Sequence, residues 1–239
     1  MFGSSLDSSQ LLQALYETLY MVTVSLVIGA LIGIPLGILL VVTRKNGIWS
    51  NTILHQVLNP IINILRSIPF IILLIAIVPF TKLLVGTSIG TTAAIVPLTV
   101  YVAPYIARLV ENSLLEVDDG IIEAAKAMGA SPLQIIRYFL LPEALGSLIL
   151  AITTAIIGLI GSTAMAGAVG GGGIGDLALV YGYQRFDTIV IVITVIVLII
   201  IVQIIQTLGN FIARVIRRNL KNEKSFFKNF WGGYFFKKI

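Results

Sequence analysis

The sequence predicts an all-α fold, a polytopic bundle of five helices that cross a membrane. The first observation is composition: 57% of the 239 residues are hydrophobic and only 11% are charged, whereas a soluble globular chain carries about 25% charged residues. The second is the presence of several long stretches without a charged side chain. The third is the distribution of Lys and Arg, which concentrate in alternate connections between those stretches, as expected for a chain that weaves through a bilayer.

About 20 apolar residues are enough for a helix to span hydrocarbon, and four stretches meet this need. They are residues 18–43, 83–107, 144–175 and 188–213. A fifth helix is expected from about Asn59 to Pro79, with Arg66 near one face or lining the interior of the protein. Pro69 and Pro79 are tolerable inside this span, because neighbouring groups can satisfy the carbonyls that prolines leave free.

The basic residues also predict the orientation of the chain. One set of alternate segments carries 13 Lys and Arg residues and the other set carries 2. The positive-inside rule therefore predicts an N-terminus outside and a C-terminus in the cytoplasm. On this topology residues 1–17 form an extracytoplasmic segment, residues 18–218 the transmembrane domain and residues 219–239 a cytoplasmic tail. Residues 9–17 allow two interpretations, a short amphipathic surface helix or a disordered tail.

The tail interleaves aromatic residues with lysines in the segment SFFKNFWGGYFFKKI, residues 225–239. Such a pattern can indicate binding of single-stranded nucleic acid. Beside a membrane the favoured interpretation is different, with rings in the headgroup layer and lysines on anionic lipid. We therefore expect membrane lipid, and no nucleic acid, as the partner of the tail.

The long connection between the third and fourth spans, Arg108 to Glu143, predicts two short helices. Asp118 or Asp119 can cap a helix that runs through Met128, and Gly129 suits the left-handed position that ends it. A second helix is then expected to start with Ser131 as cap, with Pro132 in its first turn and Gln134 completing a capping box. Pro142 is expected to break this second helix. Packing of the loop on its own membrane domain is one interpretation, and docking of a partner is the other.

The spacing of this loop resembles the EAA loop of ABC importer permeases. Glu123-Ala124-Ala125 is followed after three residues by Gly129, and Leu141-Pro142 lies at the family's distance. Phe139 stands where the family usually has Ile, and it remains apolar. Other segments are similar to the methionine-importer branch of that family, and the similarity covers about residues 15–220. These segments are residues 66–74, 79–81, 85–90, 107–112 and 164–170.

The resemblance implies a five-span permease subunit of a bacterial cell membrane that works as a homodimer. Two ATP-binding cassette subunits would hydrolyse ATP, and an extracytoplasmic substrate-binding lipoprotein would deliver the substrate, so the chain would be a transport subunit and not an enzyme. The substrate implied is an amino acid, methionine in its L or D form. Loop 111–143 would contain a coupling helix that docks into the ATPase. The residues expected to carry coupling are Glu123, Ala124, Ala125, Met128, Gly129 and Pro142.

Other motifs carry little chemistry. Residues 170–175 satisfy G-x-G-x-x-G literally, but a dinucleotide site needs a βαβ unit around that motif, and here the flanks are membrane spans. The sequence contains no Walker A motif, no cysteine and a single histidine, His55. It therefore offers no thiol nucleophile and no cluster of metal ligands, and neither a cofactor nor a metal is expected.

The glycine-rich stretch at the end of the fourth span, residues 158–175, holds eight glycines. Small residues let membrane helices approach closely, and packing explains many of these glycines. Ser162 and Met165 are among the few larger or polar residues of the stretch. We expect these two to line a translocation pathway.

Two other function classes remain as alternatives. An ion-coupled secondary transporter of a small metabolite would place ionisable residues inside the membrane, and only Arg66 is a candidate for that role. A membrane scaffold that transports nothing would leave the complete loop motif unexplained. Dependence of uptake on ATP or on a proton gradient separates the importer from the secondary transporter.

Overall fold

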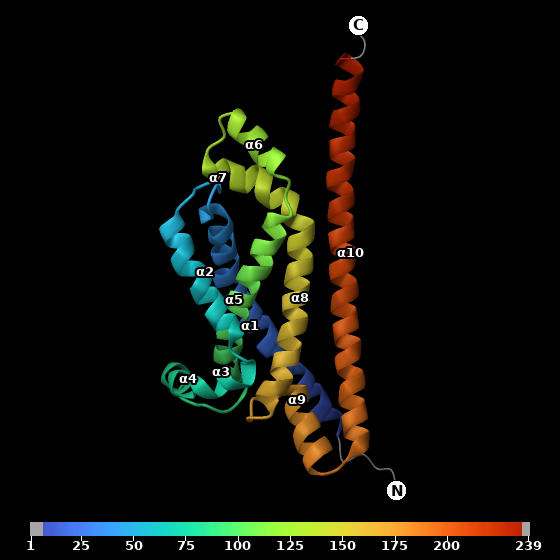
Figure 1. Ribbon diagram of the computed structural model, residues 1–239. Coiled ribbons are helices and arrows are strands. Elements are labelled where there is room, and N and C mark those ends of the chain that lie inside the picture. The colour runs from blue at the N-terminus through green and yellow to red at the C-terminus, as the bar shows by residue number, and fades with distance from the viewer. Residues whose placement is uncertain (1–6, 236–239) are drawn as a thin grey trace.

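The computed structural model describes residues 7–235, and side chains within residues 7–219. Helices joined by short connections make up the described chain, which contains no strand. Four long helices run along the molecule (Figure 1): α1 (Ser8–Thr43), α5 (Thr91–Leu115), α8 (Leu141–Gly167) and α10 (Thr188–Phe235). Each is long and apolar enough to cross a membrane, and counting one bent helix pair as a further span gives the predicted five.

The closest helix contact joins α1 to α5 and depends on glycine. Gly29, Gly33 and Gly37 repeat every fourth residue on α1, so they share one face. A Cβ atom at Gly33 or Gly37 would lie 2.5 Å from a backbone carbonyl oxygen of α5. The absence of a side chain therefore sets the distance between the two backbones, as small residues do in membrane helices. The core around this contact is formed largely by buried side chains of α5: Leu98, Val102, Ile106, Val110 and Leu114.

The expected continuous helix from Asn59 to Pro79 is wrong. The structure has α2 (Thr52–Ser67) and α3 (Phe70–Ala76) at an angle of 99° to each other, followed by α4 (Val78–Val85). The break falls at Pro69, which disfavours the α conformation in the residue before it, and Ile68 is accordingly extended at φ −79° and ψ 120°. Because α4 is separate, the third span begins at Thr91 and not at residue 83.

The expected helix break at Pro142 is also wrong. Short helix α7 (Pro132–Ile135) continues through a π-helical segment, η1 (Ile136–Leu140), directly into α8. A proline within a helix removes one hydrogen bond and crowds the carbonyl four residues before it. The wider π turn immediately before Pro142 accommodates both effects. The loop therefore connects rigidly to a membrane helix, so a displacement of the loop can be transmitted to α8.

The end of the fourth span lies earlier than predicted, because α8 ends at Gly167 and not at residue 175. Gly170, Gly172 and Gly173 have positive φ values of 78° to 81°, a backbone region that glycine adopts without strain. They turn the chain into α9 (Gly173–Leu177) and then π-helical η2 (Ala178–Gln184), which lead to α10.

Helix α1 begins at Ser8, so the stretch 9–17 is neither a separate surface helix nor a tail. Two side chains of α1 hold the glycine turn: the N–H of Gly173 donates to the Glu17 carboxylate at 2.8 Å and that of Ile174 to the Thr18 hydroxyl at 2.9 Å. Burial raises the pKa of the nearby Asp176 carboxyl, and the charge of Glu17 raises it further. Residues 1–6 of the predicted N-terminal segment and the side chains of the tail beyond residue 219 lie outside the described residues.

Candidate functional site

The predicted coupling loop forms a discrete helix, α6 (Asp119–Ala127), at one end of the bundle, opposite the end that holds α4 and α9 (Figure 1). The Asp118 carboxylate caps it by accepting from the N–H of Gly120 at 2.8 Å. Gly129 follows with φ +78°, the left-handed conformation predicted for it. Both the start and the stop read from the sequence are confirmed, and α6 exists as a capped unit.

The next helix also begins as predicted. Ser131 and Gln134 form the capping box, with the N–H of Ser131 donating to the Gln134 side-chain oxygen at 2.8 Å. Arg44, in the connection that follows α1, pairs with Asp119 at 3.6 Å. This ion pair ties α6 to the end of α1, and a polar hollow between them is lined by Arg44, Lys45, Glu123 and Lys126 among others. The connection after α1 thus contacts α6 at this end of the molecule.

The faces of α6 differ, and the structure divides the six predicted coupling residues between them. Ala125 is fully buried at 0% exposure and packs inward, whereas Met128 is 68% exposed. Glu123, Ala124 and Gly129 are also exposed. Ala124 and Met128 therefore form a narrow exposed apolar surface, and Ala125 packs the helix against its own domain. Pro142 is half-buried and lies at the start of α8.

The two predicted pathway residues also differ in exposure. Ser162 is 5% exposed, and its hydroxyl donates to the carbonyl of Gly158 in its own helix at 3.0 Å. Met165 is 51% exposed on the same helix. Of the two, only Met165 presents its side chain to the space outside the single chain.

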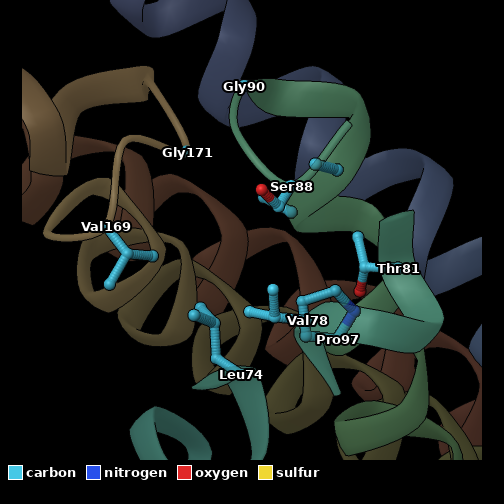
Figure 2. Close-up of a pocket in the computed structure, with 10 residues that line it drawn as sticks. Leu74, Val78, Thr81, Ser88, Gly90, Pro97, Val169 and Gly171 are labelled. Atoms are coloured by element: carbon cyan, nitrogen blue, oxygen red, sulfur yellow. The ribbon is translucent and has the colours of Figure 1, made fainter. Parts of the chain in front are cut away.

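A small pocket lies near the glycine turn, between α4, the start of α5 and the loop after α8 (Figure 2). Its cavity volume of about 20 Å³ is room for about one water molecule, and too little for an amino acid. Thr81 lines it with a buried hydroxyl that has no hydrogen-bond partner within the described chain. The pocket's other side chains include Leu74, Val78, Ser88, Pro97 and Val169.

Sequence reasoning missed a polar cluster between α2 and α5. The Arg108 guanidinium donates to the Glu111 carboxylate and to the side-chain oxygens of Asn59 and Asn63, the last two at 2.7 Å each. The signal that could have found it is helical spacing, because Asn59 and Asn63 stand four residues apart in a candidate membrane span. The prediction for that span considered only the charge of Arg66.

The described residues contain no group of three or more His, Asp or Glu side chains arranged to hold a metal ion. The described chain is thus a polytopic bundle of helices long and apolar enough to cross a membrane, with a short capped helix exposed at one end. The chain belongs to the family of binding-protein-dependent transport system inner membrane components, whose model matches residues 29–222.

Individual relatives agree with this assignment. The chain is 51% identical over 210 residues to a probable D-methionine transport system permease protein, MetI, of Vibrio cholerae, covering 88% of this chain and 93% of the relative. It is 48% identical to the methionine import system permease protein MetP of Bacillus subtilis, over 89% and 96% of the two chains. Among solved structures, a chain of the MetNI methionine ABC transporter in an inward-facing conformation superposes with a TM-score of 0.86 at 50% identity, covering 87% and 97%.

Proposed function

We propose that the chain is the membrane-spanning subunit of an ATP-driven importer that carries methionine into the cytoplasm by alternating access. The observation that carries this proposal is the exposed, capped helix α6, whose motif spacing is that of a coupling helix and whose neighbour α7 continues without a break into α8. Relatives that are about half identical are named as methionine permeases. The chain itself hydrolyses nothing in this scheme, because ATP is bound and split by separate subunits.

The proposed assembly contains two copies of this chain and two ATP-binding cassette subunits. The similar solved structure, described as a methionine ABC transporter, supports this composition. An extracytoplasmic substrate-binding lipoprotein would supply methionine, in keeping with the family's description as binding-protein-dependent. Membrane lipid is the proposed partner of the basic and aromatic tail, residues 219–239.

ATP-driven uptake tests the proposed function directly. The purified complex is reconstituted into liposomes with ATP inside and the binding protein outside, and entry of radiolabelled L-methionine and D-methionine is followed. We expect uptake that requires ATP and survives a protonophore. Uptake that needs no ATP and collapses with the proton gradient would instead support the ion-coupled secondary transporter.

Orientation is proposed from the distribution of charge, with the N-terminus outside. Arg44, Lys45 and Lys126 lie at the end of the bundle that carries α6, and this end would face the cytoplasm. The chain has no cysteine, so a thiol reagent labels this subunit only at the single cysteine that is introduced. We expect an impermeant thiol reagent to label Gln184→Cys from outside and Asn51→Cys only from inside. Labelling of both from one side would contradict the five-span topology.

Met165 is proposed to face the translocation pathway near the axis that relates the two copies. Its exposed thioether is flexible enough to close a gap and to reorient, and small neighbours leave it room to move. Ser162 would not face the pathway itself; its buried hydroxyl would stabilise the backbone of the same helix. The labelling series extends to this position: Met165→Cys should react with a hydrophilic thiol reagent at a rate that changes when ATP is added. A thiol that is inert in every state would place Met165 against lipid.

A further inference from the structure

Helix α2 carries a polar face that a membrane span in contact with lipid would not carry. At 100° per residue, its polar side chains all fall within an arc of about 120°, and its apolar side chains occupy the remainder. Asparagine and arginine groups within hydrocarbon are costly, and they normally face protein or water. The apolar side is exposed to the surroundings, as Ile53, Val57 and Ile64 show. The residues of the polar face are His55, Gln56, Asn59, Asn63, Arg66 and Ser67.

Helix α5 carries a second polar stripe beside the first. Tyr101, Tyr105, Arg108 and Asn112 follow one another at spacings of four, three and four residues, so they share one face of the helix. None of these four side chains is fully buried, although most residues on the other faces of α5 are buried. The stripe extends about 16 Å along the helix axis. From Tyr101 to Asn112, the residues on this line that are not fully buried carry a hydroxyl, guanidinium or amide group.

The two stripes meet at Arg108. One guanidinium nitrogen donates to both Asn59 and Asn63 at 2.7 Å, the other to Glu111, and Nε has no hydrogen-bond partner within the described chain. The side chains of Arg108 and Glu111 are 17% and 10% exposed, respectively. The pair is neutral overall, which lowers the cost of holding a charge at this depth. We call the joined surface the polar wall, formed by Asn59, Asn63, Tyr101, Tyr105, Arg108 and Asn112.

We propose that the polar wall lines a water-filled part of the translocation pathway and contacts a zwitterionic amino acid as it passes. This inference rests on the proposed function and names the surface that serves it. The amide and guanidinium groups offer donors and acceptors to the substrate's carboxylate and ammonium groups. Tyr101 and Tyr105 stack with ring centroids 6.3 Å apart, and Phe70 meets Tyr101 edge-on at 5.3 Å. This aromatic row suits an apolar side chain, and a thioether packs well at ring edges.

The wall also continues toward Met165. A Cβ atom at Gly158 would lie 3.5 Å from the Tyr105 ring, and the next positions of α8 on that side, Gly161 and Met165, are exposed. A close helix–helix interface between the two copies is the alternative explanation of the polar wall. It fits less well, because close helix contacts in membranes use small residues, as the glycines of α1 do against α5. Long polar side chains instead suit a surface that stays in contact with water.

Single cysteines compare the polar wall with the opposite face of α2. In the reconstituted complex, with both sides of the membrane accessible, we measure the reaction of Asn63→Cys and Asn112→Cys with a charged methanethiosulfonate. Ile64→Cys and Val57→Cys are the matched controls, exposed at 64% and 53% for the native side chains. We expect the wall cysteines to react at least about tenfold faster, because a charged reagent reaches thiols in water but not thiols in hydrocarbon. Methionine should slow the reaction of the wall cysteines only.

The outcomes separate this inference from the proposed function. Equal rates on the two faces of α2 would overturn the polar wall even if the native complex takes up methionine. Reactive wall cysteines that methionine fails to protect would overturn the substrate contact. Failure of ATP-driven uptake by the native complex would count against the proposed function alone, provided that the wall cysteines still react.

A second variant tests the contact made by Arg108. Arg108→Lys keeps the charge but loses the planar fork, which bonds Glu111 through one nitrogen and both asparagines, Asn59 and Asn63, through the other. We expect a KM for uptake raised at least about fivefold, with assembly and ATP hydrolysis in the absence of substrate retained. Asn59→Gln, which keeps an amide near the same site, should retain more activity than Asn59→Leu. An unchanged KM in Arg108→Lys would contradict a role in contacting or orienting the substrate.

Discussion

Replacing Ala124 with Trp is expected to abolish ATP-driven uptake while the bundle remains folded. Ala124 is exposed on α6, the helix proposed to insert into a cleft of the ATPase. A large ring on a surface formed by small side chains would prevent close approach. Hot-spot positions of an interface contribute about 2 kcal/mol or more, and a loss of that size should weaken retention of the ATPase by the purified chain about 30-fold. Uptake and substrate-stimulated ATP hydrolysis should fall together, because both require the same docking.

Two further substitutions vary the same surface in different ways. Met128→Asp introduces a charge at the exposed apolar end of the helix, where desolvation on docking would be costly. Gly129→Val strains the left-handed turn by about 1–2 kcal/mol. A Cβ atom at Gly129 would contact nothing within 4 Å, so the effect is confined to the backbone. Gly129→Asn is the matched control, since asparagine tolerates this conformation, and it should retain most coupling.

A control substitution on an exposed surface away from α6 is available at the other end of the molecule. Phe186 is 88% exposed and has φ 57°, a conformation that aspartate accepts better than phenylalanine does. Phe186→Asp should leave ATPase retention unchanged, since this residue lies in the connection between η2 and α10, away from α6 (Figure 1). Normal uptake by Ala124→Trp would refute the docking role proposed for α6.

Local signals in the sequence predicted the bounds of α6 closely. Asp118, Gly129 and the pair Ser131 and Gln134 act through atoms only two or three residues away, so their consequences can be read without knowing the fold. The long apolar stretches predicted the membrane helices for a similar reason, since length and composition decide whether a helix can span. These features required no knowledge of which helix packs against which.

Features that depend on tertiary contacts were predicted less well. Pro142 would break an isolated helix, but a π turn just before it lets the helix continue. Pro69, by contrast, does end α2, and α3 leaves at 99°; the extended conformation of Ile68 before Pro69 makes this break. Ala125 could not be distinguished from Ala124 by its residue type, and only the packing of α6 on its own domain turns one inward and the other outward. The two asparagine partners of Arg108 are 45 and 49 residues away in sequence, beyond the reach of local patterns.

The second large effect is expected at the contact between α1 and α5. Gly37→Ala adds one methyl group at a point 2.5 Å from the carbonyl oxygen of Ala107 and 2.7 Å from Cβ of Val110. The obstructing atoms belong to the backbone and to the first atom of a β-branched side chain, so neither can rotate away. The two helices must therefore separate, and the packing lost along the whole contact should cost about 2–3 kcal/mol, the upper end of the range for overpacked sites.

Gly161→Ala is the matched control for this substitution, because it makes the same chemical change within another membrane helix. A Cβ atom at Gly161 would meet nothing within 4 Å, so only the helix propensity of alanine acts, which favours it over glycine by up to about 1 kcal/mol. Unfolding of the purified subunit in mixed detergent micelles should therefore shift in opposite directions, earlier for Gly37→Ala and unchanged or later for Gly161→Ala. Equal unfolding midpoints for the two variants would show that the α1–α5 contact accommodates the added methyl group without loss of stability. The opposite signs matter because a general intolerance of α-helical glycines to substitution would shift both variants the same way.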